Sequence, residues 1–106
     1  MKRDVAAGIL LVNTIPHAVM GLAGKTAMTP LGGPDSSPEL NLVWAGMNLA
    51  GGLTALVSGH WRAADQLTAQ RRLSALQAGV FAFATFGFVY ERTAGRRRRA
   101  ALAAAG

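Results

Sequence analysis

Two polar side chains and a proline interrupt the first apolar stretch of the chain, and they are its best candidates for chemistry. Asn13, Pro16 and His17 lie within five positions of one another. Because proline has no N–H, the carbonyl of Val12 loses its usual helical partner, and we expect a kink in this helix at Pro16. Asn13 and His17 are four residues apart and share a helix face. Polar and ionisable groups at membrane depth often mark pathways or binding positions.

Two interpretations of this cluster are open. In the first, Asn13 and His17 satisfy the carbonyls freed by Pro16 and bond to a neighbouring helix, where Asn48 is a natural partner. In the second, the cluster is part of a binding site or polar pathway formed by Asn13, Pro16, His17, Asn48 and Thr54. We favour the structural role and keep the binding site as a hypothesis.

No pattern in the chain predicts metal binding or catalysis. His17 and His60 are the two histidines. Their positions along the predicted helices place them toward opposite membrane faces. We therefore expect no metal, no haem and no other cofactor. The chain contains no cysteine, which excludes disulfides, thiol catalysis and thiolate metal sites. It also lacks a phosphate-binding loop, an HExxH motif and a nucleophile elbow. We therefore predict that the protein is not an enzyme.

The elements that must position these residues are three stretches that are apolar on every side. They span about residues 5–23, 40–57 and 73–90, and none contains Asp, Glu, Lys or Arg. Each is long enough to cross a hydrocarbon core of about 30 Å. Helices that are apolar all round belong in lipid or in a large core, which 106 residues cannot easily provide. The sequence predicts one all-α domain of three transmembrane helices, with a soluble three-helix bundle as the alternative.

The segments between the spans predict how the helices connect. Residues 25–39 contain three prolines and two adjacent glycines and are expected to form a loop. Two start signals for the second helix compete, either a capping box from Ser36 to Glu39 or Ser37 as the cap with Pro38 at the first helical position. Residues 59–72 lack proline and favour helix. We therefore predict that the second and third helices form a tight hairpin, against which the first helix packs.

Small and aromatic side chains indicate how these helices contact each other and the bilayer. Small residues at four-residue spacing on the second helix let two backbones approach closely in lipid, and the predicted packing positions are Gly46, Ala50, Gly51 and Ala55. Aromatic side chains near the ends of spans are typical of membrane interfaces, and the predicted interfacial anchors are Trp44, Trp61 and Tyr90.

The chain is basic, with a net charge of +6. In a soluble protein this would suggest nucleic acid, but beside apolar spans it favours contact with anionic lipid headgroups. We assign that role to a basic tail over residues 91–106, and within it to Arg96, Arg97, Arg98 and Arg99. Positive residues are divided almost equally between the two sides, so the positive-inside rule does not orient the chain.

The first half of the chain resembles a group of small uncharacterised bacterial integral membrane proteins. The resemblance is carried by the run from Asn13 through Pro16-His17 to Gly21, then by Met28-Thr29-Pro30, and finally by Asn41, Trp44 and Asn48. It implies a multi-pass protein of the bacterial inner membrane, and it implies no reaction or ligand. The N-terminal run also resembles a signal peptide, but it is longer than a usual apolar core of that kind, and we expect it to be retained.

These observations favour a non-catalytic function. Three spans are too few to enclose a pore, small residues offer packing faces, and catalytic motifs are absent. The expected function is an accessory or assembly subunit whose partners are the lipid bilayer and other membrane proteins or further copies of itself. The alternative is a homo-oligomeric transporter or channel with a polar pathway around Asn13, His17 and Asn48, in which Pro16 acts as a hinge.

Overall fold

The computed structural model describes residues 2–60 and 65–106, except for the side chains of residues 59 and 60. Within these ranges three long helices are present, α1 (Lys2–Leu22), α2 (Pro38–His60) and α3 (Gln66–Tyr90). All three are long and apolar enough to cross a membrane. The predicted all-α fold with three candidate spans is therefore confirmed.

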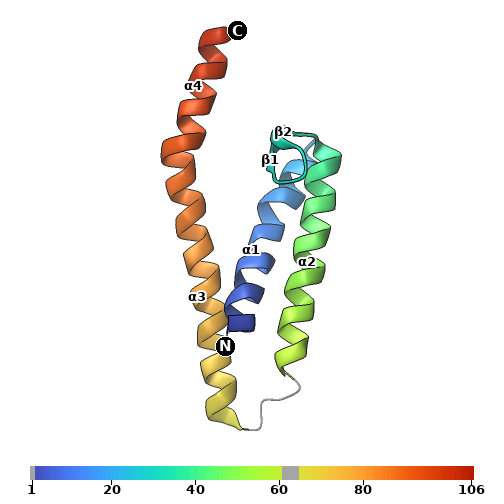
Figure 1. Ribbon diagram of the computed structural model, residues 1–106, viewed down its shortest axis with the longest axis vertical. Coiled ribbons are helices and arrows are strands. Elements are labelled where there is room, and N and C mark those ends of the chain that lie inside the picture. Colours follow the sequence, from blue (N-terminus) through green and yellow to red (C-terminus); the bar gives the residue numbers. More distant parts are fainter. Residues whose placement is uncertain (1, 61–64) are drawn as a thin grey trace.

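The helix α1 lies in the middle of the bundle. It packs against both α2 and α3, which run antiparallel on either side of it (Figure 1). The two arms of the predicted hairpin are thus present, but they do not pack tightly against each other as expected. The reason is that α1 occupies the space between them.

Two glycines bring α1 and α3 together near the N-terminus. A Cβ atom added to Gly8 would lie 2.2 Å from the carbonyl oxygen of Leu76, and one added to Gly79 would lie 2.2 Å from the carbonyl oxygen of Val5. Only glycine permits backbones this close. From this crossing the two helices separate toward the other end of the bundle (Figure 1).

The helix α1 is continuous through Pro16, so the proline does not end it. It ends instead in a glycine cap: Gly24 adopts a φ of 68°, and the N–H of Lys25 donates to the carbonyl of Met20 over 2.9 Å. This arrangement satisfies carbonyls at the helix terminus that have no partner within the helix.

A small β-hairpin follows, where the sequence predicted only a loop. The strands β1 (Ala27–Thr29) and β2 (Gly33–Ser36) pair antiparallel. Strands this short, one of them containing a proline, carry no alternating pattern that a sequence could reveal. The hydroxyls of Thr29 and Ser36, both buried, lie 2.7 Å apart and join the strands.

The start of α2 resolves the two competing cap signals. The N–H of Leu40 donates to the Ser37 hydroxyl over 3.2 Å, and Pro38 is the first helical residue. The Ser36 hydroxyl instead belongs to the β-hairpin, where it pairs with Thr29 and donates to the carbonyl of Gly33 at 2.8 Å.

The basic tail is helical, which the sequence analysis did not predict. The π-helical turn η1 (Glu91–Gly95) and the helix α4 (Arg96–Ala105) continue α3 as one rod of 40 residues, about 60 Å long (Figure 1). Ion pairs join Arg98 to Asp35 of β2 and Arg99 to Glu91. The first of these contacts holds the tail beside the β-hairpin.

Burial in this protein is the reverse of that in a soluble domain. Among the described residues the buried hydrophobic side chains are Ala7 and Ala45, whereas the largest fully buried side chains are polar. Large hydrophobic side chains on all three helices face outward, including Val19 at 57%, Leu53 at 46% and Phe81 at 75% exposure. Such a surface is stable where lipid surrounds it.

A buried ion pair joins all three helices near the N-terminus, and the sequence analysis missed it. One carboxylate oxygen of Asp4 accepts from Nη2 and Nε of Arg72, at 2.6 and 3.0 Å. Nη2 also donates to the carbonyl of Leu56 in α2, at 3.3 Å. Arg72 is the last residue of the segment 59–72 that separates the second and third apolar stretches, but it is 7% exposed and lies inside the bundle.

We predict that Asp4→Asn destabilises the bundle by about 3 kcal/mol, because it leaves the charge of Arg72 buried without its carboxylate. Thermal unfolding in detergent, followed by circular dichroism, measures the loss. The matched control is Asp35→Asn, which removes an ion pair that is largely exposed and should cost less than about 1 kcal/mol. Equal losses in the two variants would contradict a structural role for the buried pair.

A second prediction concerns Asp65, the N-cap of α3. Its carboxylate accepts from the N–H of Thr68 at 2.7 Å, and this hydrogen bond holds the pKa of Asp65 below its ordinary value. The cap therefore stabilises α3 fully at pH values above the unfolded pKa of about 4, and its contribution disappears as the pH falls through the lower folded pKa. The carbon-13 NMR titration of the carboxyl group should show the lowered pKa.

The control for this prediction is Asp65→Ser, which keeps a capping oxygen but cannot titrate. Its thermal stability should fall less in acid than that of the unsubstituted chain, because the contribution of the Asp65 cap no longer depends on pH. A midpoint for Asp65 at or above that of a model peptide would contradict the cap.

Candidate functional site

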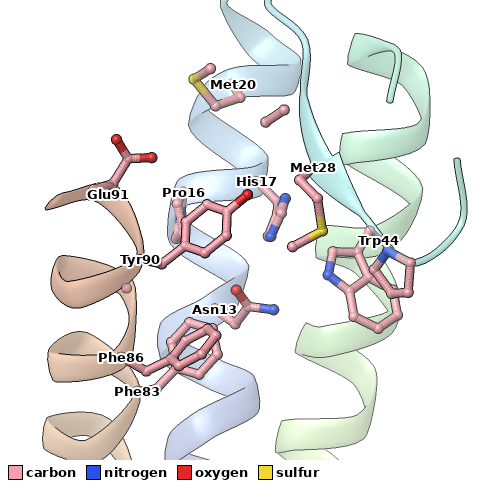
Figure 2. A pocket seen from close by; sticks show the side chains of 13 residues that line it. Asn13, Pro16, His17, Met20, Met28, Trp44, Phe83, Phe86, Tyr90 and Glu91 are labelled. Atoms are coloured by element: carbon pink, nitrogen blue, oxygen red, sulfur yellow. The ribbon is translucent and has the colours of Figure 1, made fainter. Parts of the chain in front are cut away.

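A cavity of about 460 Å³ lies in the half of the bundle nearer the β-hairpin (Figure 2). It is bounded by α1, by α3 and by the hairpin, and Trp44 of α2 forms part of its wall. The side chains that matter most for its chemistry are Asn13, Pro16, His17, Phe83, Phe86 and Tyr90. The three from α1 are the residues that the sequence singled out.

The path of α3 creates this cavity. The Gly8–Gly79 crossing holds α3 against α1 at one end only, and α3 leans away from α1 beyond it (Figure 1). Side chains of α3 partly fill the resulting space. Phe86 lines the cavity and is nevertheless 59% exposed, so the cavity is not sealed from the surroundings of the bundle.

Asn41 fixes the side of the cavity formed by α1 and the hairpin. It is completely buried, and its amide nitrogen lies within hydrogen-bond distance of three carbonyls, those of Ala27, Ser36 and Ser37, at 3.2, 3.1 and 3.0 Å, which share its two hydrogens. Its amide oxygen lies 2.7 Å from Nδ1 of His17. This side chain therefore connects α1, the β-hairpin and the first turn of α2.

These hydrogen bonds decide the tautomer of His17. The three carbonyls can only accept, so the Asn41 amide must present its nitrogen to them and its oxygen to the imidazole. Nδ1 of His17 therefore carries the hydrogen, and in the neutral ring Nε2 is the acceptor. No described residue forms a hydrogen bond with Nε2, and His17 lines the cavity.

A second polar contact, in the middle of α1, joins it to α2. Nδ2 of Asn13 donates to the amide oxygen of Asn48 at 3.1 Å, and Nδ2 of Asn48 donates to the carbonyl of Trp44 at 2.7 Å. Both asparagines are buried, at 8% and 2% exposure. This is the helix-to-helix contact that the structural interpretation of Asn13 describes. The partner of His17 is Asn41 instead of Asn48.

The remaining residues of the proposed pathway do not join this group. The hydroxyl of Thr54 donates to the carbonyl of Ala50 and is exposed on α2. Pro16 does line the cavity. Of the five candidate binding residues, the structure thus brings Asn13, Pro16 and His17 to one cavity, places Asn48 behind Asn13, and leaves Thr54 apart.

The small residues predicted to pack have mixed surroundings. A Cβ atom on Gly46 would meet nothing within 4 Å, and Ala50 is exposed. Gly51 lies against Leu10 of α1, with 3.3 Å to a Cβ built there, and Ala55 is half-buried. The tightest contacts on the described helices instead involve glycines outside the predicted set, namely Gly8, Gly21, Gly52 and Gly79.

The predicted interfacial residues differ in their roles. Trp44 and Tyr90 are half-buried and line the cavity, while Trp61 lies outside the described residues.

In the tail, Arg98 and Arg99 form the ion pairs given above, and Arg96 and Arg97 are exposed. Lipid headgroups therefore stay the predicted partners of this arginine run.

Within residues 2–60 and 65–106, no cluster of three His, Cys, Asp or Glu side chains could hold a metal ion.

Comparison with known proteins adds no assignment, since no protein family, curated protein or solved structure matches the chain. The resemblance to small bacterial membrane proteins stays a prediction.

We predict that the neutral imidazole of His17 is the Nδ1–H tautomer. Nitrogen-15 NMR of a His60→Gln variant, in which His17 is the remaining histidine, should give the Nδ1 chemical shift of a protonated nitrogen and the Nε2 shift of an unprotonated one. Asn41→Leu removes the acceptor and should shift the ring toward the Nε2–H tautomer that predominates in free histidine. A wild-type ring already in that form would contradict the hydrogen-bond assignment.

Proposed function

We propose that this protein is a small, non-catalytic, multi-pass subunit of the bacterial cell membrane that packs against other membrane proteins. The proposal rests on how little of the apolar helix surface is buried by other parts of the described chain. Only 6% of the apolar stretch of α3 is buried, against 22% for α1 and for α2. Beyond the Gly8–Gly79 crossing, α3 leans away from the other described helices (Figure 1).

A specific contact face on α2 supports this proposal. Gly46 and Ala50 lie one helical turn apart on the outside of the helix, and neither is covered by another part of the described chain. In lipid, where helices gain nothing from leaving water, such small residues favour association by allowing close backbone contact. We assign this face to a helix of another membrane protein.

The alternative of a homo-oligomeric transporter or channel has weaker support. Nδ2 of Asn13 donates to the amide oxygen of Asn48, whereas Thr54 is exposed and donates to the carbonyl of Ala50. The Asn48 amide and the amide nitrogen of Asn13 are therefore occupied in holding α1 to α2, and they do not extend the polar group toward Thr54.

The proposal predicts that the protein extracted in mild detergent is found in a complex heavier than its own 11.0 kDa. Native mass spectrometry measures the mass. Gly46→Leu combined with Ala50→Leu fills the face, and overpacking of this kind should reduce the complexed fraction about tenfold. Ala6→Leu, at an exposed position of α1, is the control and should leave the complex intact.

A monomer without a co-purifying protein would overturn the proposal. An assembly made of this chain alone would favour the transporter or channel alternative.

A further inference from the structure

Two separate chains of hydrogen bonds inside the bundle end at the cavity, and both end in an acceptor. The first runs from three backbone carbonyls through Asn41 to His17 and leaves Nε2 of the neutral imidazole unused. Backbone carbonyls only accept, so the direction of donation along this chain is fixed. The free end of the chain is therefore a lone pair that faces the cavity.

The second chain is fixed in the same way. The carbonyl of Trp44 accepts from Nδ2 of Asn48, which orients the Asn48 amide so that its oxygen accepts from Nδ2 of Asn13. The amide oxygen of Asn13 forms no hydrogen bond with any described residue. Figure 2 shows this oxygen on the side of the cavity and the amide nitrogen on the side of α2. Asn13 and His17 are one turn apart, so the two acceptors lie along one face of α1.

A third polar group lies on the opposite wall. The hydroxyl of Tyr90 forms no hydrogen bond with any described residue, and Tyr90 lines the cavity from α3 (Figure 2). A hydroxyl can both donate and accept. A ligand hydroxyl placed between the two walls can thus donate to Nε2 of His17 and accept from Tyr90.

The rest of the cavity indicates what carries that hydroxyl. Phe83 and Phe86 line it with their rings, and these two rings lie 5.8 Å apart at 45° to each other. Aromatic walls favour an aromatic ligand ring, which stacks or meets them edge to face. The carboxylate at the rim, Glu91, is already paired with Arg99 at 2.6 Å. A cation would therefore find no free countercharge and would be costly to desolvate, whereas a neutral ligand would not.

We propose that the cavity binds a neutral, lipid-soluble molecule with a hydroxylated aromatic head, a phenol or a hydroquinone, whose hydroxyl donates to Nε2 of His17. The volume of about 460 Å³ is within the range of small-molecule sites. The opening beside Phe86 lets an apolar tail extend into the lipid. This site does not depend on the α2 contact face, so its test and that of the proposed subunit function can fail separately.

The experiment compares two probes, 4-decylphenol and its methyl ether 4-decylanisole, in which a methyl group replaces the hydrogen of the hydroxyl and so removes the hydrogen-bond donor. The full chain carrying Trp61→Phe is placed in phospholipid nanodiscs, so that Trp44 in the cavity wall is the remaining tryptophan. Its fluorescence is followed as the mole fraction of each probe in the lipid is raised. The phenol should bind about three- to tenfold more tightly than the ether, which is the value of one net hydrogen bond.

The decisive variant is His17→Asn. An asparagine amide reaches the position of Nδ1, so it keeps a donor for Asn41 and removes the acceptor at Nε2. Affinity for the phenol should fall to that of the ether, while affinity for the ether stays unchanged. Thermal unfolding of the variant shows whether the bundle is intact.

Two further variants, Tyr90→Phe and Phe86→Ala, keep the proposal testable if His17→Asn does not fold. Tyr90→Phe removes an unpaired hydroxyl and should weaken both probes about threefold, because the oxygen of either probe can accept from that hydroxyl. Phe86→Ala removes part of the aromatic wall and should weaken both probes, whereas Phe81→Ala, at an outward position of the same helix, should affect neither.

Equal affinities for phenol and ether in the unsubstituted cavity would overturn the proposal. It would also be overturned by phenol binding that survives both His17→Asn and Tyr90→Phe, by fluorescence that does not saturate, or by tighter binding of decylamine than of the phenol.

Discussion

At the end of the bundle that contains the cavity, Asn41 holds α1, the β-hairpin and the start of α2 together. Its amide nitrogen occupies the carbonyls at the end of the β-hairpin and the start of α2, and its oxygen holds the imidazole of His17 on α1. Within a bilayer no water replaces a lost partner, so every one of these groups must be satisfied by the chain itself. The position of the hairpin, the entry angle of α2 and the orientation of His17 thus follow from one buried amide.

The opposite end of the bundle is held by a different means. There Asp4, Arg72 and the carbonyl of Leu56 join α1, α3 and α2, and the Gly8–Gly79 crossing brings the α1 and α3 backbones together beside them. Polar contacts and backbone proximity, and not an apolar core, provide the specificity of the fold. This is the arrangement expected when lipid solvates the outer surface, because apolar side chains then gain little by meeting each other.

The cavity is a consequence of this unequal attachment. The contact at one end holds α3 to α1, and at the other end the ion pair between Arg98 and Asp35 joins the tail to the β-hairpin. The space between is lined by aromatic side chains of α3 on one wall and by polar groups of α1 on the other. The hydrogen bonds that stabilise α1 against α2 also leave acceptors pointing into that space, so the same residues serve both the fold and a ligand. The outer face of α2, where Gly46 and Ala50 are uncovered, is the contact surface that we propose for a protein partner.

The sequence by itself determined the three helices, because a run of apolar residues of membrane length needs no information from elsewhere in the chain. It also identified Asn13, Pro16 and His17, since polar residues are conspicuous in such a run, and it offered Ser37-Pro38 as one of two starts for α2. It gave no sign of the Asp4–Arg72 pair, whose members are 68 positions apart, or of the role of Asn41. Those contacts, the placement of α1 between the other helices, and the cavity depend on which helix faces meet. In helices that are apolar on every side no amphipathic stripe marks that face, and only tertiary structure decides it.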